Sequence, residues 1–130
     1  MPVQPHLMVG PGDVAPIALV PGDPRRVLRI AEKMDSARKV AENRQFITYT
    51  GEYRGVPVSA VSSGIGGPAA AITLEELVRV GVRCVIRVGT CGALQPGVEP
   101  GDIVVATAAV RDEGASAAYA PPIYPAVASR

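Results

Sequence analysis

Aromatic residues are scarce in this sequence, which has no tryptophan, one phenylalanine and four tyrosines in 130 residues. Proteins that bind single strands of nucleic acid stack the bases on aromatic side chains, so this class is disfavoured. The formal net charge is only +1, which provides no general attraction to nucleic acid or to an anionic membrane surface. We therefore expect neither as a partner, and any anion site has to be local.

Cysteine and histidine are also few. Cys84, Cys91 and the single histidine, His6, do not form the clusters typical of a disulfide framework or a zinc site. No apolar run approaches the ~20 residues that span a bilayer, and the first residues lack the pattern of a secretion signal. These absences predict a cytoplasmic protein with reduced thiols.

Short apolar runs alternate with glycine-rich turns, which is typical of α/β folds. Residues 17–20 predict a buried strand, and the turn 21–24 follows it. Asp23 is the expected N-cap of a helix and Pro24 its first residue. The apolar face of this helix is predicted from helical spacing to hold Val27, Ile30, Ala31 and Met34.

The middle of the chain repeats this arrangement. Residues 46–50 and 56–62 predict an antiparallel pair of strands joined by a glycine-bearing loop. The turn 63–68 then opens a helix that ends at Gly81, with Glu75 paired to Arg79. Its apolar face is expected to hold Ala70, Leu74, Leu77 and Val78.

The last part contains two predicted strands, residues 84–88 and 103–110, with the turn 89–92 after the first. Residues 1–16 are interpreted as an irregular arm. Residues 111–130 form a loop-like tail, which is either a surface loop or a proline-rich recognition segment. The pattern predicts one α/β domain over residues 1–130 that is interrupted at its carboxyl end.

Arginines stand beside the glycine turns, where ligands bind at the carboxyl ends of strands. Arg25 and Arg26 lie in the first turn of a helix, where the helix dipole disfavours a cation unless an anion is bound. Arg87 interrupts an apolar strand, so its guanidinium needs a phosphate or a carboxylate partner. The alternative for Arg25 and Arg26 is simple exposure to solvent.

Other residues carry weaker signals. The glycine turns match neither the dinucleotide-binding pattern nor a P-loop. Cys91 could be a nucleophile, but with no histidine nearby a small turn residue is the simpler interpretation. Taken alone, Arg44 predicts a solvated surface and His6 an exposed, inert position.

Four segments in order resemble the nucleoside phosphorylase family: V-P-G-D-P-R-R, S-S-G-I-G-G-P, R-V-G-T-C-G-A-L-Q-P and P-G-D-I-V-V. The stretch A-A-V-R-D-E-G-A-S with Y-A-P-P-I-Y-P-A-V-A resembles its uridine phosphorylase branch. The resemblance implies a twisted mixed β-sheet flanked by helices. It also implies dimers, often arranged in hexameric rings, whose active sites are shared by two subunits.

The resemblance also implies roles for individual residues. Arg44 would reach the phosphate, and His6 the ribose 5′-hydroxyl, of the neighbouring subunit's site. Phosphate would be held by Gly22, Arg26, Arg87 and Thr90, and the ribose and base pocket would be lined by Thr90, Cys91 and Gly92.

The implied reaction is reversible phosphorolysis of a nucleoside to free base and ribose 1-phosphate, with phosphate as co-substrate and no cofactor. Uridine is the expected substrate, but Cys91 stands where uridine phosphorylases usually carry threonine, so a purine nucleoside is the alternative. Gln45 replaces the glutamate of a cation site known in some relatives, so no metal is expected. The family's base-binding segment is missing, which leaves a non-catalytic binding chain or one part of a two-chain assembly as a further alternative.

Overall fold

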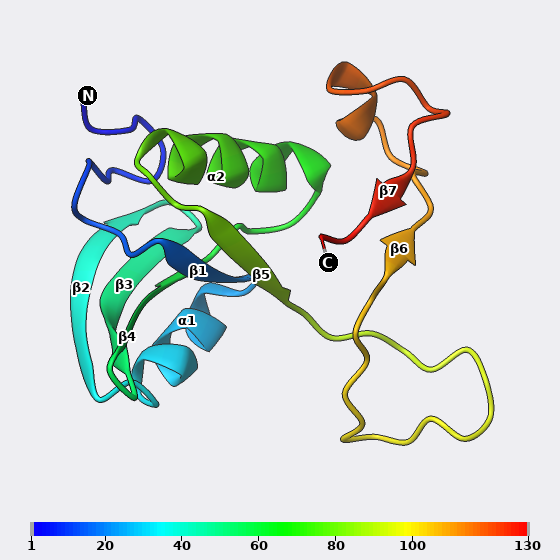
Figure 1. Cartoon of the computed structure of the whole chain (residues 1–130), viewed down its shortest axis with the longest axis horizontal. Helices are drawn as coiled ribbons and strands as arrows, with labels where there is room; N and C mark the ends of the chain where they lie inside the picture. The colour runs from blue at the N-terminus through cyan, green and yellow to red at the C-terminus, as the bar shows by residue number, and fades with distance from the viewer. Residues whose placement is uncertain (1, 130) are drawn as a thin grey trace. The chain divides into compact units, whose positions relative to one another are not determined.

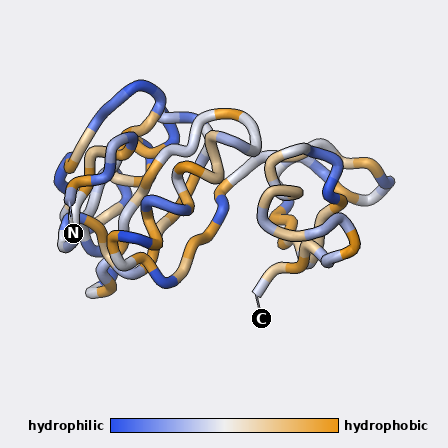
Figure 2. The backbone as a smooth tube through the Cα atoms, turned by 90° about the horizontal axis from the view of Figure 1, so that it is seen from above, coloured by the Kyte–Doolittle hydropathy of each residue, from blue (hydrophilic) through white to orange (hydrophobic). Residues whose placement is uncertain are grey.

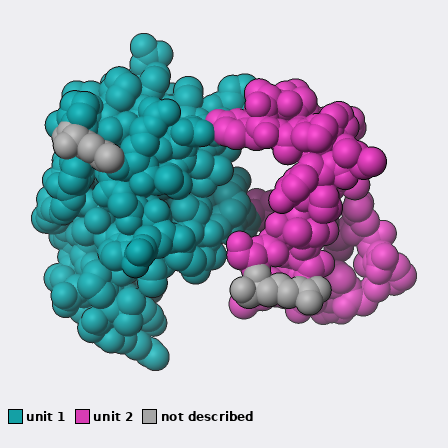
Figure 3. Space-filling model, turned by 45° about the horizontal axis from the view of Figure 1, so that its top comes forward, with its two compact units in different colours: residues 1–89 teal, residues 90–130 magenta. Residues whose placement is uncertain are grey.

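The computed structural model describes residues 2–129. The chain forms two compact units, Met1–Gly89 and Thr90–Arg130, which Figure 3 colours separately. Within residues 2–129, no helix is long and apolar enough to cross a membrane. The single domain expected over residues 1–130 stays a prediction, and each unit is described by itself.

A five-stranded mixed sheet forms the centre of the first unit, in the order β2-β3-β4-β1-β5 (Figure 1). β1 pairs in parallel with β4 and β5, whereas β3 pairs antiparallel with β2 and β4. The strands are β1 (Ile17–Pro21), β2 (Ser36–Asn43), β3 (Phe46–Tyr53), β4 (Val56–Val61) and β5 (Cys84–Val88). The expected mixed sheet is confirmed, and β2 is a strand that the sequence patterns did not indicate.

The two helices cover opposite faces of this sheet (Figure 1). The connection through α1 (Pro24–Ala31) leads from β1 towards β4, and the one through α2 (Gly67–Arg79) leads from β4 across β1 to β5. Because parallel crossovers are right-handed, connections that run in opposite directions place their helices on opposite faces. The carboxyl ends of β1, β4 and β5 therefore lie at one edge, between the two helix layers.

Helix α1 begins as predicted. The Asp23 carboxylate accepts a hydrogen bond from the Arg25 N–H at 2.9 Å, and Pro24 is the first helical residue. The helix buries Val27 and Ala31 but ends before Met34, so that residue does not belong to its apolar face. A short helix thus follows the first glycine turn directly.

The main core lies between the sheet and the segment that precedes β1. Residues 2–16 contain no helix or strand, as expected of an irregular arm, yet Leu7 and Val9 are fully buried in this core. The other buried members come from the strands, α2 and the segment after it: Ala18, Val20, Phe46, Val61, Leu77, Val80 and Val82. The arm is therefore a structural part of the first unit.

Helix α2 buries only part of the face that was expected, because Leu77 is buried but Leu74 and Val78 are not. Thr73, Glu76 and Leu77 are buried, whereas Leu74 is 42% exposed and Val78 is 64% exposed. Burial of the two polar side chains is tolerated because each has a hydrogen-bond partner. Thr73 Oγ1 donates to a backbone carbonyl of its own helix at 3.0 Å, and the Glu76 carboxylate accepts hydrogen bonds from the arm. The expected Glu75–Arg79 pair is confirmed at 3.3 Å.

The second unit has little regular structure. β6 (Ala108–Ala109) pairs antiparallel with β7 (Ala126–Val127), and a 3₁₀ turn, η1, spans Ser116–Ala118. The strand expected over residues 103–110 is wrong: Ile103 is 91% exposed, and only two residues of the segment find a pairing partner. Apolar and polar segments alternate along this unit (Figure 2), but none of its described side chains is fully buried.

One arginine organises the tail of the second unit. The Arg111 guanidinium donates to the Ser116 hydroxyl at 3.1 Å and to the Ser116 carbonyl at 2.8 Å. It also donates to the carbonyl oxygens of Ala120 at 2.7 Å, Pro121 at 2.6 Å and Tyr124 at 2.9 Å. These bonds connect residues far apart along the loop, so a single side chain holds the turn together.

Candidate functional site

Two glycine-containing turns and the end of β5 meet at the carboxyl edge of the sheet. Pro21 and Val88, the last residues of β1 and β5, are paired in register. The turn after β4 joins them, because the Ser63 N–H donates to the Pro21 carbonyl at 2.9 Å and the Gly64 N–H donates to the Gly22 carbonyl at 3.0 Å. The turns after β1 and β4 and the end of β5 thus form one continuous edge.

Two arginines converge on this edge. Arg26 Nη1, from the first turn of α1, lies 3.4 Å from the Val88 carbonyl oxygen, and Arg87 Nη1 donates to the same oxygen at 2.7 Å. Arg87 Nη1 also lies 3.4 Å from the Val20 carbonyl. Neither guanidinium forms an ion pair with a carboxylate of the described chain. Two positive charges are therefore held close together without a negative partner.

Glycine at position 22 leaves the space for this arrangement. A Cβ atom there would lie 3.1 Å from the Gly64 carbonyl oxygen and 3.3 Å from Arg87 Nη2. Both distances are tighter than ordinary van der Waals contact, so a side chain would push on the guanidinium or on the neighbouring turn. The structure thus brings together three of the predicted phosphate residues, Gly22, Arg26 and Arg87.

Arg44 occupies the turn between β2 and β3, next to the same edge. Its neighbour Gln45 packs against Gly64, where an added Cβ atom would lie 2.6 Å from Gln45 Cγ. The Ser62 hydroxyl also donates to the Gln45 carbonyl at 2.6 Å. Arg44 itself is exposed and forms no hydrogen bond or ion pair with any described residue, so its side chain is available to a partner.

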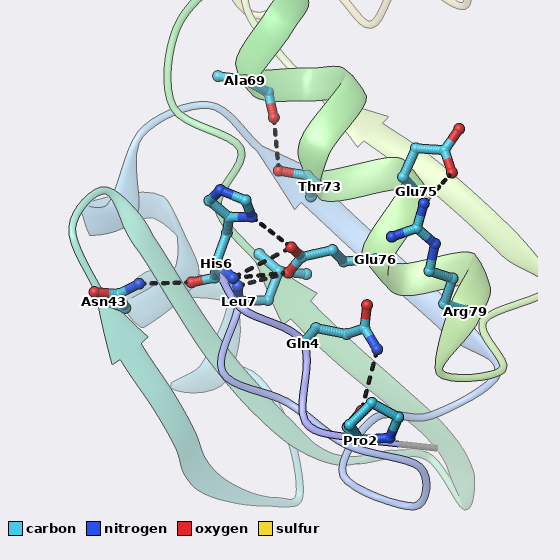
Figure 4. A network of polar contacts seen from close by, with 10 residues as sticks. All are labelled: Pro2, Gln4, His6, Leu7, Asn43, Ala69, Thr73, Glu75, Glu76 and Arg79. Atoms are coloured by element: carbon cyan, nitrogen blue, oxygen red, sulfur yellow. Dashed lines mark hydrogen bonds and ion pairs between the residues drawn. The ribbon is translucent and has the colours of Figure 1, made fainter.

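His6 is held by residues that the sequence patterns did not single out (Figure 4). Its Nδ1 lies 2.6 Å from Oε1 of Glu76, and the N–H groups of His6 and Leu7 donate to the same carboxylate at 3.2 Å and 2.8 Å. The Asn43 side-chain amide donates to the His6 carbonyl at 2.9 Å. His6 is therefore held by the helix and by the sheet, and its expected role at the ribose stays a prediction.

A signal for Glu76 was present in the sequence. Glu76 follows Thr73 by three residues and precedes Val80 by four, so it lies on one helical stripe with two buried residues. A carboxylate on a buried stripe requires donors from another segment. Nothing in the sequence indicates which segment supplies them, because the arm is 69 residues away along the chain.

Thr90, Cys91 and Gly92 open the second unit. All three residues are exposed, and the side chains of Thr90 and Cys91 form no hydrogen bond within the described chain. Their expected roles at phosphate, ribose and base stay predictions. The first unit alone supplies the cluster of Gly22, Arg26 and Arg87, with Arg44 near its edge.

This arrangement suits a small oxyanion. Two unpaired charges at hydrogen-bond distance from one oxygen repel each other by on the order of 1 kcal/mol even after screening by water. A phosphate bound between them would remove that repulsion and accept charge-assisted hydrogen bonds from both guanidinium groups. The first turn of α1 adds the positive end of a helix dipole, partly offset by its Asp23 cap.

Comparison with known proteins agrees with this geometry. Residues 16–130 match the family model described as the phosphorylase superfamily. The chain belongs to this superfamily. It is 52% identical over 126 residues to a uridine phosphorylase of Thermococcus kodakarensis, an alignment that covers 97% of this chain and 46% of that protein. The predicted membership of the nucleoside phosphorylase family is thereby confirmed.

Two further relatives extend the comparison. A guanosine phosphorylase of Halorubrum lacusprofundi is 52% identical over 127 residues, covering 98% of this chain and 53% of the relative. The crystal structure of a uridine phosphorylase from Vibrio fischeri ES114 superposes with a TM-score of 0.95 at 46% identity, covering 99% of this chain and 54% of that one. This chain thus has the superfamily's fold and spans about half the length of the relatives that it matches.

Proposed function

We propose that this chain is the phosphate-holding part of a nucleoside phosphorylase, with uridine as its first-choice substrate. The reaction is reversible phosphorolysis, in which phosphate attacks the anomeric carbon and yields free base and ribose 1-phosphate. The observation that carries this proposal is the meeting of the Arg26 and Arg87 guanidinium groups at one carbonyl oxygen, without a carboxylate partner. Membership of the superfamily supports it.

The chemistry assigns a definite task to these residues. As the glycosidic bond breaks, positive charge grows on the ribose and negative charge on the departing base, so an anionic nucleophile must be held against the sugar. Arg26 and Arg87 hold the phosphate, and the absence of a side chain at Gly22 lets the anion approach the backbone. Thr90 adds a hydroxyl donor, and Cys91 and Gly92 line the ribose and base pocket.

The proposal includes a second subunit. Arg44 is free and His6 is fixed with part of its ring exposed, so both side chains are suited to reach a ligand held by another copy. In this assembly, a homo-oligomer built from dimers, Arg44 contacts the phosphate and His6 the ribose 5′-hydroxyl of the neighbouring site. We place the protein in the cytoplasm, with no cofactor besides the co-substrate phosphate.

A purine nucleoside is the second candidate substrate. The guanosine phosphorylase of Halorubrum lacusprofundi is as similar to this chain as the uridine phosphorylase of Thermococcus kodakarensis, each being 52% identical. Cys91 also occupies the position at which a second threonine is usual in uridine phosphorylases. A small, weakly polar side chain at that turn fits either base.

The deciding experiment measures phosphate-dependent release of uracil, hypoxanthine or adenine from the corresponding nucleosides. It is performed with this chain and with a longer chain, in which the protein encoded directly after residue 130 is added. Release of uracil by either form supports the first candidate, and release of a purine base supports the second. Release by neither form, with phosphate still protecting the fold, would refute the enzymatic proposal and leave a binding protein.

Phosphate protection provides the matched test of the site. A ligand at 100 times its dissociation constant stabilises the folded state by about 2.7 kcal/mol, which thermal unfolding detects. Arg87→Ala should abolish this shift. Arg79→Ala is the control, because Arg79 is exposed and pairs only with Glu75 on the surface of α2. Equal protection of the two variants would refute the assignment of Arg87.

A further inference from the structure

A buried polar contact in the first unit joins the arm to helix α2. The Glu76 side chain is 4% exposed. Its carboxylate accepts hydrogen bonds from the backbone N–H groups of His6 and Leu7 and contacts the His6 ring nitrogen Nδ1 (Figure 4). A buried carboxylate is costly without donors, and here three groups of one segment supply them. Two of these groups are backbone N–H groups, which tie the arm to α2.

The ring contact goes beyond anchoring. At 2.6 Å the Nδ1–Oε1 contact is short and charge-assisted, and it fixes the rotation of the imidazole. The Phe46 ring meets the imidazole edge to face, with centroids 6.5 Å apart and an interplanar angle of 76°. The His6 side chain nevertheless remains 45% exposed, so a rigidly held ring presents its other nitrogen outward.

A carboxylate can only accept, so Nδ1 must carry the proton in this contact. In a neutral imidazole the other nitrogen, Nε2, then holds a lone pair. We propose that Glu76 is a positioning residue, whose carboxylate holds His6 with Nδ1–H directed inward and leaves Nε2 as the acceptor for a sugar hydroxyl group. The ligand in this statement rests on the proposed function, in which His6 meets the ribose 5′-hydroxyl.

Asn43 supports the same arrangement from the sheet. Its amide donates to the His6 carbonyl at 2.9 Å, and the next residue along the chain is Arg44. The backbone on both sides of the His6 ring is thus fixed, by β2 and by α2. His6 and Arg44, the two residues that we assign to the neighbouring site, therefore lie close to each other in the first unit, joined through Asn43.

The tautomer is measured without any substitution. His6 is the only histidine, so the imidazole signals in a ¹H–¹⁵N correlation spectrum of labelled protein belong to it alone. At about pH 8, where an ordinary imidazole is neutral, we expect a proton on Nδ1 and none on Nε2. The opposite tautomer, a doubly protonated ring or the averaged signals of a mobile ring would overturn the proposal.

The functional half of the proposal is tested on phosphorolysis of uridine and of 5′-deoxyuridine. Losing one hydrogen bond to the 5′-hydroxyl should lower kcat/KM of the wild type for the deoxy substrate by about tenfold. His6→Ala and Glu76→Gln should both abolish this discrimination. Glu75→Gln, the same change at the exposed neighbouring position of α2, should preserve it.

The outcomes separate the two proposals. Full discrimination in Glu76→Gln would refute the positioning role even if the tautomer is as expected. Failure of both this chain and its extended form to release base from any nucleoside would refute the proposed function and the sugar ligand with it. The assignment of Nδ1–H to Glu76 would then still be decided by the imidazole spectrum.

Discussion

A side chain at position 22 would press on the candidate site from two directions. Because a methyl group there would lie 3.1 Å from the Gly64 carbonyl and 3.3 Å from Arg87 Nη2, Gly22→Ala should displace the guanidinium. We expect a loss of about 1 to 3 kcal/mol in unfolding free energy and a larger relative loss of phosphate protection. Thermal unfolding with and without phosphate measures both effects.

Gly114→Ala is the control for this substitution. An added Cβ atom at Gly114 meets nothing within 4 Å, and its backbone does not require glycine. This variant should keep the stability and the phosphate response of the wild type. Unchanged phosphate protection in Gly22→Ala would show that the close approach at Gly22 has no part in anion binding.

Glu113 gives a pH-dependent prediction in the second unit. A hydrogen bond from the Ser116 side chain, helped by the backbone N–H groups of Ser116 and Ala115 and by the Arg111 charge, lowers the pKa of Glu113 below its ordinary value of 4.5. A depressed pKa means that its stabilisation is complete above 4.5 and is lost as the pH falls through the folded-state value. The turn should therefore open in acid.

The measurement is an acid titration followed through the amide signals of Ala115 and Ser116. Their shifts should change with a midpoint below pH 4.5 in the wild type, and Glu113→Gln should remove the transition. The carboxylate is exposed to solvent, so the effect on global stability is small. A midpoint at or above the ordinary value would contradict the role of these hydrogen bonds.

At the scale of elements, α2 offers a matched pair of leucines. Leu77 is fully buried in the main core, whereas Leu74, three residues earlier and at the border of the same side of the helix, is 42% exposed. Leu77→Ala should cost about 2 to 5 kcal/mol through lost burial and a cavity, whereas Leu74→Ala should cost far less. Denaturant unfolding of both variants checks this, and equal losses would mean that the buried face is wrongly assigned.

The same helix shows where sequence patterns succeed and where they fail. The turn and helix at residues 21–31 were predictable, because an N-cap, a proline and helical spacing are all local signals. The buried face of α2 was not, since burial of Glu76 depends on donors 69 residues away along the chain. Strand β2 was missed because its sequence, S-A-R-K-V-A-E-N, is polar and edge strands tolerate charge.

The candidate site divides in the same way. Arg26 and Arg87 were singled out because charge at a helix start or inside an apolar strand is unfavourable without a partner, although the structure shows Arg87 exposed. Arg44 and His6 carry no such local signal, and only the family resemblance indicated them. Only the structure shows that the two residues lie near each other. Asn43 contacts the arm, and Gln45, in the same β2–β3 turn, contacts the glycine turn after β4.

At the scale of the whole molecule, the two units are stabilised in different ways. The first contains all the fully buried apolar residues of the described chain, which supply most of its folding free energy. The second has no buried core of its own and relies on the hydrogen bonds of Arg111 and a two-residue ladder. Arg26 and Arg87, which we propose hold phosphate, therefore lie on the unit that has the buried core, which suits a site that must hold an anion in place.

The proposed sharing of one active site by two subunits can be tested only in an assembly of two chains. If Arg87 binds phosphate within one subunit and Arg44 reaches the phosphate of its neighbour, Arg44→Ala and Arg87→Ala should each suppress phosphorolysis. When the two variants are mixed, unfolded and refolded together, half of the dimers combine both chains, and each of these has one intact site. Activity should recover to about a quarter of the wild-type value, as expected for random pairing across a two-fold interface.

The two variants refolded separately are the controls and should remain inactive. Recovery in the mixture requires both arginines to serve one site from different chains, because no chain in it carries both. Activity that stays at the level of the separate variants, while co-purification of two differently tagged variants shows that mixed dimers form, would place Arg44 and Arg87 in the same subunit's site. The exposed and unpaired Arg44 side chain favours the first outcome, since nothing in its own described chain competes for it.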